Sequence, residues 1–140
     1  MAFVQTATDV FKVGLLDGTF NFTTDTFKIA LYTGNATLNA STAVYTATDE
    51  ASGGNYVAGG QTLVVSQVPT TGGSGNTAYL SFSNVSWTGA ITARGALIYD
   101  VTNANKTVCV LDFGADKTSA TTFTVQFPAA TNTSAILRIS

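Results

Sequence analysis

The sequence predicts an all-β fold, an antiparallel β-sandwich of about seven or eight strands with a short N-terminal helix. Apolar and polar residues alternate in most segments after residue 18, and turn-forming Gly, Pro and Asn residues separate these segments. Strand patterns do not alternate with helical ones, so a parallel sheet is not expected. We expect residues 1–18 to form an N-terminal arm or helix and residues 19–140 a single β-sandwich domain.

The N-terminal segment carries the one helical pattern of the sequence. Its apolar residues recur at spacings of three and four, which places them on one face of a helix. This stripe consists of Phe3, Ala7, Val10, Phe11 and Leu15. Thr8 and the acidic Asp9 are suited to begin a helix, and Gly18 is suited to end it. We therefore expect a helix over residues 9–16, with an irregular arm as the alternative.

Alternating segments predict the strands. The expected strands span residues 26–33, 61–68, 77–83, 91–101, 107–113, 121–127 and 135–139, with a further short strand near 44–45. In the first of them, Phe27, Ile29 and Leu31 should share one face because side chains alternate across a strand. The strand over 107–113 should return antiparallel to 91–101 as a hairpin.

Turn-forming residues predict where the strands end. Pro69 and Pro128 should each stop the strand before them, because proline cannot donate a ladder hydrogen bond. The Gly- and Ser-rich residues 70–76 predict a flexible loop, and residues 114–120 predict a polar loop.

The composition predicts association with other proteins. Charged residues make up 10% of the 140 residues, against about 25% in typical soluble proteins. A surface of Thr, Ser, Asn and Gln packs closely against a partner because few ions must lose their water. The six basic residues are scattered and the net charge is −2, so no nucleic acid partner is expected.

The sequence predicts no membrane partner. No apolar run approaches the roughly 20 residues that a spanning helix needs. The first residues lack the basic and apolar stretches of a signal peptide. We therefore expect synthesis in a cytoplasm.

Few residues are suited to catalysis. The sequence contains no histidine, which excludes serine triads, papain-like dyads and histidine-ligated metals. Cys109 lies in an apolar run and predicts a buried thiol. Asp49 and Glu50 predict a solvated turn. Asp112 and Asp116 predict a turn that accepts backbone hydrogen bonds, with a hard-cation site as the alternative. We therefore assign no catalytic, cofactor-binding or metal-binding residue and expect no enzyme activity.

Two aromatic residues allow more than one interpretation. Trp87 follows an alternating apolar strand, so we expect it in the core, although a sugar-stacking platform with Tyr56 is an alternative. Tyr56 lies among glycines and is expected to be exposed or at an interface. The candidate interface residues are Phe3, Val4, Val10, Phe11 and Tyr56.

The order of several motifs resembles a family of small structural proteins encoded by tailed bacteriophages, including cyanophage-like podoviruses. The motifs are LLDG (15–18), DTFKIALYT (25–33), NYVAGGQTL (55–63), WTGAITARGALIY (87–99), VLDFGADK (110–117) and FTVQFP (123–128). The resemblance covers roughly residues 9–139. It implies a virion component, foremost a capsid decoration (cement) protein, and it carries over no catalytic residue.

The resemblance implies a partner and a place. We expect the protein to bind the exterior of the phage head, to bridge subunits of the major capsid protein, and to form a homo-oligomer, with a trimer favoured. It would be made in the host cytoplasm and end on the outer surface of the virion. We expect removal of residues 1–16 to abolish head binding and leave a folded sandwich. A tail, collar or fibre-adaptor protein and a carbohydrate-binding module for host glycans are the alternatives.

Overall fold

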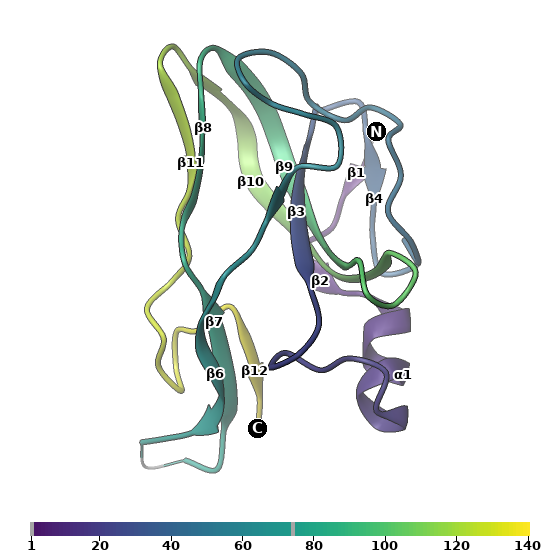
Figure 1. Ribbon diagram of the computed structural model, residues 1–140, viewed down its shortest axis with the longest axis vertical. Helices are drawn as coiled ribbons and strands as arrows, with labels where there is room; N and C mark the ends of the chain where they lie inside the picture. Colours follow the sequence, from purple (N-terminus) through teal and green to yellow (C-terminus); the bar gives the residue numbers. More distant parts are fainter. Residues whose placement is uncertain (1, 74) are drawn as a thin grey trace.

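The computed structural model describes residues 2–73 and 75–140, and it confirms an all-β fold with one short helix (Figure 1). The helix α1 spans Asp9–Asp17, and the strands of the described residues are β1 (Ala2–Phe3), β2 (Thr6–Ala7), β3 (Phe27–Tyr32), β4 (Thr37–Leu38), β5 (Gln61–Thr62), β6 (Val65–Thr71), β7 (Ala78–Phe82), β8 (Val85–Thr88), β9 (Ile91–Asp100), β10 (Lys106–Ser119), β11 (Thr122–Val125) and β12 (Leu137–Ile139).

One layer is a five-stranded antiparallel sheet in the order β2-β10-β9-β3-β5. Its centre is the pairing of β3 with β9, in which Ile29 lies opposite Ile98 and Leu31 opposite Ala96. The predicted hairpin of β9 and β10 is confirmed. These three strands are rich in Val, Ile, Leu and aromatic residues, which pack well on a pleated, buried surface.

The second layer consists of two small antiparallel sheets. The pair β8–β11 and the three strands β12-β7-β6 follow one another along the left side of Figure 1 and face the five-stranded sheet. Only residues 83–84 separate β7 from β8, so the chain continues from one small sheet into the other. Leu80, Phe82 and Trp87 are buried, as their alternating positions predict.

Both faces of β3 are covered. Phe27, Ile29 and Leu31 belong to the main core between the two layers. Ala30 and Tyr32 belong to a smaller core on the other face, which also includes Leu38, Leu97, Tyr99 and Val110. This second core explains why nearly all of β3 is buried, whereas a strand with one face in water alternates.

The helix α1 has the predicted ends. The Thr8 hydroxyl accepts a hydrogen bond from the Phe11 amide at 3.4 Å, and Gly18 ends the helix with a φ of 77°. Before the helix, β1 pairs in parallel with β4, and β2 pairs with β10. Within the described residues, α1 is the helix of the protein, and it is too short and too polar to cross a membrane.

One predicted strand end and one predicted loop differ in the structure. Pro69 lies inside β6, at an irregularity between the Gln67–Ser81 and Thr70–Tyr79 pairs. The strand continues because it is an edge strand, where proline at an irregular position removes no ladder hydrogen bond. The predicted polar loop over 114–120 is also wrong, since β10 pairs again with β9 from Lys117 to Ser119.

Very short strands account for several of the remaining differences. The strands β1, β2, β4 and β5 have two residues each, too few to show any period in the sequence. The strand predicted near residues 44–45 is a single bridge between Val44 and Lys106.

Candidate protein-binding surface

The outward face of α1 exposes large apolar side chains. Leu16 is 92% exposed, Val13 is 62% exposed and Leu15 is 37% exposed. Across a groove from the helix, Ile139 of β12 is 59% exposed. We call Val13, Leu15, Leu16 and Ile139 the α1 patch. A cluster of exposed large apolar side chains on one helix marks a candidate site of protein association.

The inward face of α1 holds the helix to the body of the protein. Phe11 packs edge-on against Phe20 and Phe22, with ring centroids 5.0 and 6.0 Å away. Gly14 lies against the Phe20 ring so closely that any side chain at position 14 would collide with it. Because these contacts fix the helix, Leu16 is held in water by the fold.

A groove of about 300 Å³ separates α1 from β7 and β12 at the lower end of Figure 1. Its lining is mainly apolar, and it includes the core residues Phe11, Phe22 and Leu80. The charged residues of the lining are both basic, Lys12 and Arg138. The Arg138 guanidinium also donates a hydrogen bond to the Thr133 carbonyl oxygen. The groove therefore combines an apolar floor with a positive rim.

The five predicted interface residues do not form one surface. Val4 is 52% exposed, whereas Phe3 and Val10 are half-buried and Phe3 packs against the smaller core. Phe11 is 5% exposed and has no surface to offer a partner. Tyr56 is half-buried beside Trp87, with ring centroids 5.6 Å apart. The helical stripe in the sequence thus marked mostly the inward side of this segment.

The N-terminal segment is part of the core. Thr8 is fully buried, and its hydroxyl lies 3.1 Å from the Thr107 carbonyl oxygen and 3.0 Å from the Thr107 hydroxyl. The Thr8 amide donates to the Val108 carbonyl oxygen at 3.0 Å. Removing residues 1–16 would open the main core at Phe11 and strip an edge from β10. We therefore expect such a truncation to unfold the sandwich, which corrects the expectation from sequence.

Glu50 organises the long connection between β4 and β5. Its carboxylate accepts hydrogen bonds from the Tyr45 hydroxyl at 2.7 Å, the Tyr56 hydroxyl at 2.5 Å and the Gly59 amide at 2.7 Å. The Tyr56 hydroxyl in turn accepts from the Leu31 amide at 2.9 Å. The predicted solvated turn at Glu50 is therefore wrong. We call Tyr45, Glu50, Tyr56 and Gly59 the Glu50 cluster.

Burial changes the acidity of the tyrosines around this cluster. Burial, with the nearby Glu50 carboxylate adding to it, raises the pKa of Tyr45 and of Tyr56 well above the usual 10.0. The same two causes raise the pKa of Tyr99 to about 12. These hydroxyls stay protonated and donate, as the hydrogen bond from Tyr99 to the Gly59 carbonyl oxygen at 2.6 Å requires.

Asp112 has the turn role that the sequence predicts. Its carboxylate accepts from the Arg94 Nε at 3.0 Å and from the Gly114 amide at 2.8 Å, and the hydrogen bond from Arg94 lowers the pKa of Asp112. Asp116 lies beside Gly34. Among the described residues, no group of three or more Cys, Asp or Glu side chains is placed to hold a metal ion.

The two remaining single residues are both buried. Cys109 is 4% exposed, as predicted, and burial raises the pKa of its thiol to about 12. Trp87 is 1% exposed and lies in the main core. Its indole Nε1 is buried without a hydrogen-bond partner among the described residues. A sugar platform built on Trp87 and Tyr56 therefore does not form.

Sequence reasoning missed the most exposed residues of the α1 patch. Leu16 and Val13 lie off the apolar stripe, and a large apolar residue off the stripe of a capped helix is the signal that would have found them. Glu50 had no such signal, because its partners meet only when the connection folds onto the sheet.

Comparisons of this chain with protein-family models, with curated proteins and with solved structures found no match. The α1 patch and its groove are therefore interpreted from their own geometry.

Proposed function

We propose that this protein is a structural protein of a phage virion, a capsid decoration protein that binds the head exterior through the α1 patch. The observation that carries the proposal is the exposure of Leu16, Val13 and Ile139 beside an apolar groove. A chain does not gain stability from apolar side chains in water, so such a patch is explained by a partner that covers it.

The low charge of the chain supports the same role. With 10% charged residues, the surface around the patch can be buried with little loss of ion hydration. Each contact would be weak, but symmetric repetition over a shell sums many of them. The motif order that resembles phage virion proteins supplies the identity of the partner, the major capsid protein.

The rigid seat of α1 suits a bridging role. Phe11 and Gly14 fix the helix against the core. The helix therefore loses little conformational entropy when the α1 patch binds a partner. We expect a small cyclic homo-oligomer, a trimer, because a capsid offers threefold and quasi-threefold positions. Light scattering after size-exclusion chromatography tests this, and a monomer at the highest soluble concentration would contradict it.

The decisive experiment is co-sedimentation of the purified protein with heads that lack it. Leu16→Glu should weaken head binding by about thirtyfold or more, because burial of a leucine contributes about 2 kcal/mol and a carboxylate opposes burial. Val57→Glu is the matched control, since Val57 is 71% exposed and lies in the connection before β5. It should bind as the wild type does.

Two outcomes would contradict the proposal. Equal binding of Leu16→Glu and wild type would remove the α1 patch from the interface. A decoration protein should be present in a copy number per virion comparable to that of the capsid protein. A copy number that fits a single ring of subunits would instead place the protein in the tail or collar. The proposal assigns no catalytic, cofactor or metal residue, so turnover of a substrate by the purified protein would also contradict it.

A further inference from the structure

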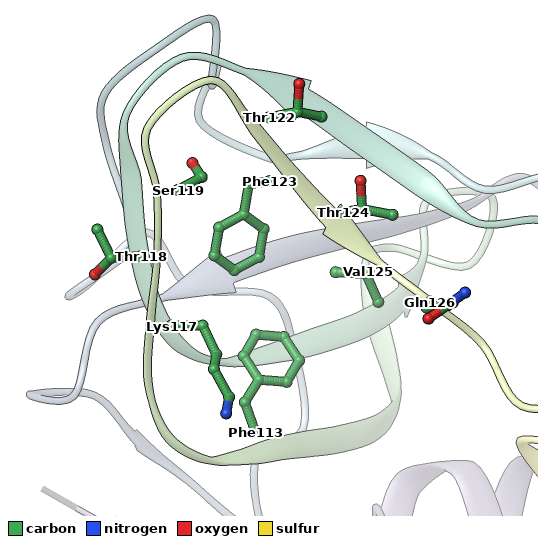
Figure 2. Close-up of a pocket in the computed structure, with 9 residues that line it drawn as sticks. All are labelled: Phe113, Lys117, Thr118, Ser119, Thr122, Phe123, Thr124, Val125 and Gln126. Atoms are coloured by element: carbon green, nitrogen blue, oxygen red, sulfur yellow. The ribbon is translucent and has the colours of Figure 1, made fainter.

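A second hollow, of about 410 Å³, lies between β10 and β11 (Figure 2). It shares no lining residue with the groove beside α1. Figure 2 shows Phe113, Phe123 and Lys117 directed into the hollow, whereas the hydroxyls of Thr122 and Thr124 point away from it. The centroids of the two phenyl rings are 6.2 Å apart. The volume of the hollow, about 410 Å³, lies within the range of about 300–1,000 Å³ that is usual for ligand pockets.

A large bulge in β10 creates this hollow. Asp112 pairs with Gly95 and Lys117 pairs with Ala93, so residues 113–116 lie opposite the single residue Arg94. The ion pair of Arg94 with Asp112 and the Gly114 backbone, with a φ of 83°, hold the bulge. Bulges bend strands and re-aim side chains, and they are frequent beside functional sites. Here the bulge brings Phe113 over the hollow.

The strands that border the hollow have free edges. Among the described residues, β11 pairs with β8 alone, and β10 pairs with β2 through Cys109 and Val110 only. Beyond these pairs, the outer edges of β10 and β11 offer backbone groups to another strand, apart from the Asp112 and Gly114 amides, which donate to the side chains of Gln5 and Asp112. Peptides that add a strand to such an edge gain affinity from main-chain hydrogen bonds and specificity from a side-chain pocket.

The chemistry of the lining favours an apolar side chain with a neighbouring acid. Phe113, Phe123 and Val125 form apolar walls, and Lys117 is exposed. The ion pair found among the described residues is that of Arg94 with Asp112, so Lys117 has its charge free.

A sugar fits the lining less well. The Thr124 hydroxyl is bonded to Ser86 at 2.8 Å, and the Ser119 hydroxyl donates to the Gly89 carbonyl oxygen at 2.7 Å. These two hydroxyls are therefore already engaged within the protein, which leaves them fewer hydrogen-bonding sites for a sugar ring.

We propose that this hollow is a peptide-docking site. An extended segment of a partner polypeptide packs one large apolar side chain against Phe113 and Phe123 and places an acidic residue beside Lys117. The site is separate from the α1 patch and does not depend on the virion assignment.

A random peptide library displayed on yeast tests this site with the full-length protein. Selection should enrich peptides in which a large apolar residue lies next to Asp or Glu. Synthetic, fluorescently labelled copies of these peptides then give affinities by fluorescence polarisation. Phe113→Ser should weaken binding by about tenfold or more, because the apolar side chain loses one wall.

Lys117→Glu tests the charge at an exposed position that does not contribute to the core. It should weaken binding of the acidic peptide, and a peptide with Lys in place of its acid should bind this variant better than the wild type. Lys106→Glu, the same charge change at the first residue of β10, is the matched control and should bind like the wild type.

The proposal is overturned if no peptide is enriched, if the enriched peptides lack an acid, or if Lys117→Glu binds them as the wild type does. Displacement of the peptide by free glucuronate at matched ionic strength would also overturn it, in favour of an acidic sugar. Loss of head binding by Leu16→Glu leaves this test unaffected, so the two proposals fail separately.

Discussion

The Glu50 cluster and the α1 patch differ in whether other residues of the same protein contact them. In the Glu50 cluster, every named donor has its acceptor, because two tyrosine hydroxyls and one backbone amide donate to the carboxylate. In the α1 patch, Leu16 is 92% exposed and faces nothing within the described residues. The comparison separates residues that stabilise the fold from residues that are available to a partner.

The largest effect is expected from Glu50→Leu. This change leaves the Tyr45 and Tyr56 hydroxyls and the Gly59 amide without their acceptor, at a cost of about 4 kcal/mol in the free energy of unfolding. Urea denaturation measures it. Asp49→Asn, at the exposed neighbour, is the control and should change stability by less than about 0.5 kcal/mol. Equal stability of Glu50→Leu and wild type would mean that the connection does not depend on its carboxylate.

The two faces of α1 should respond differently to alanine. Phe11→Ala opens a cavity in the main core and should lower the free energy of unfolding by about 3 kcal/mol. Leu16→Ala removes a side chain that is already in water and should change it by less than about 0.5 kcal/mol. A large loss with Leu16→Ala in the isolated protein would show that the patch is covered by the chain itself or by a second copy.

Parts of the fold around these regions could be predicted from particular residues of the sequence. Thr8 and Gly18 predicted both ends of α1, and the alternation in β3 predicted which of its residues share a face. Local patterns are sufficient in those places because the relevant contacts lie within a few residues.

Other features depend on contacts between distant segments. Glu50 meets the Leu31 amide only through Tyr56, and Pro69 is tolerated only because β6 lies at an edge. Phe113 is turned by a bulge that depends on pairing with Arg94 in another strand. No periodicity within one segment reports such contacts, which is why sequence reasoning assigned a solvated turn, a strand end and a polar loop there.

Alkaline pH should weaken the protein through the buried tyrosines. The pKa of Tyr99 rises from 10.0 to about 12 on folding, so the unfolded chain releases its proton first. The contribution of protonated Tyr99 to the free energy of unfolding is fully present below pH 10 and is lost as the pH rises toward 12. Denaturation midpoints at a series of alkaline pH values measure this loss, and tyrosinate absorbance follows the ionisation. Tyrosinate absorbance of the folded protein that rises as early as in urea would contradict the buried arrangement.

The smallest effect concerns Asp100, a buried carboxyl outside both regions. Burial raises its pKa to about 6, with Asp25 nearby, since the Asn103 amide donates to both carboxylates at 2.7 and 2.8 Å. Because the pKa of Asp100 is raised in the folded protein, protonated Asp100 stabilises the fold. This contribution to the free energy of unfolding is present below about pH 4 and is lost as the pH rises through 6.

Asp100→Asn removes that titration and should flatten the change in stability between pH 4 and 7 relative to the wild type. Asp25 and Lys106 flank the group and are unchanged in both proteins. Urea midpoints of the two proteins across this range give the difference. Parallel curves would contradict the raised pKa of Asp100.

The most direct test of the account asks whether the α1 patch is covered in the assembled particle. The Leu16→Cys variant, and Val57→Cys as control, are treated with a maleimide before and after binding to heads. The native Cys109 thiol is buried and should not react with the maleimide. We expect both introduced thiols to react in the free protein and only the one at position 57 to react on the head. Rapid labelling at position 16 on decorated heads would contradict the account.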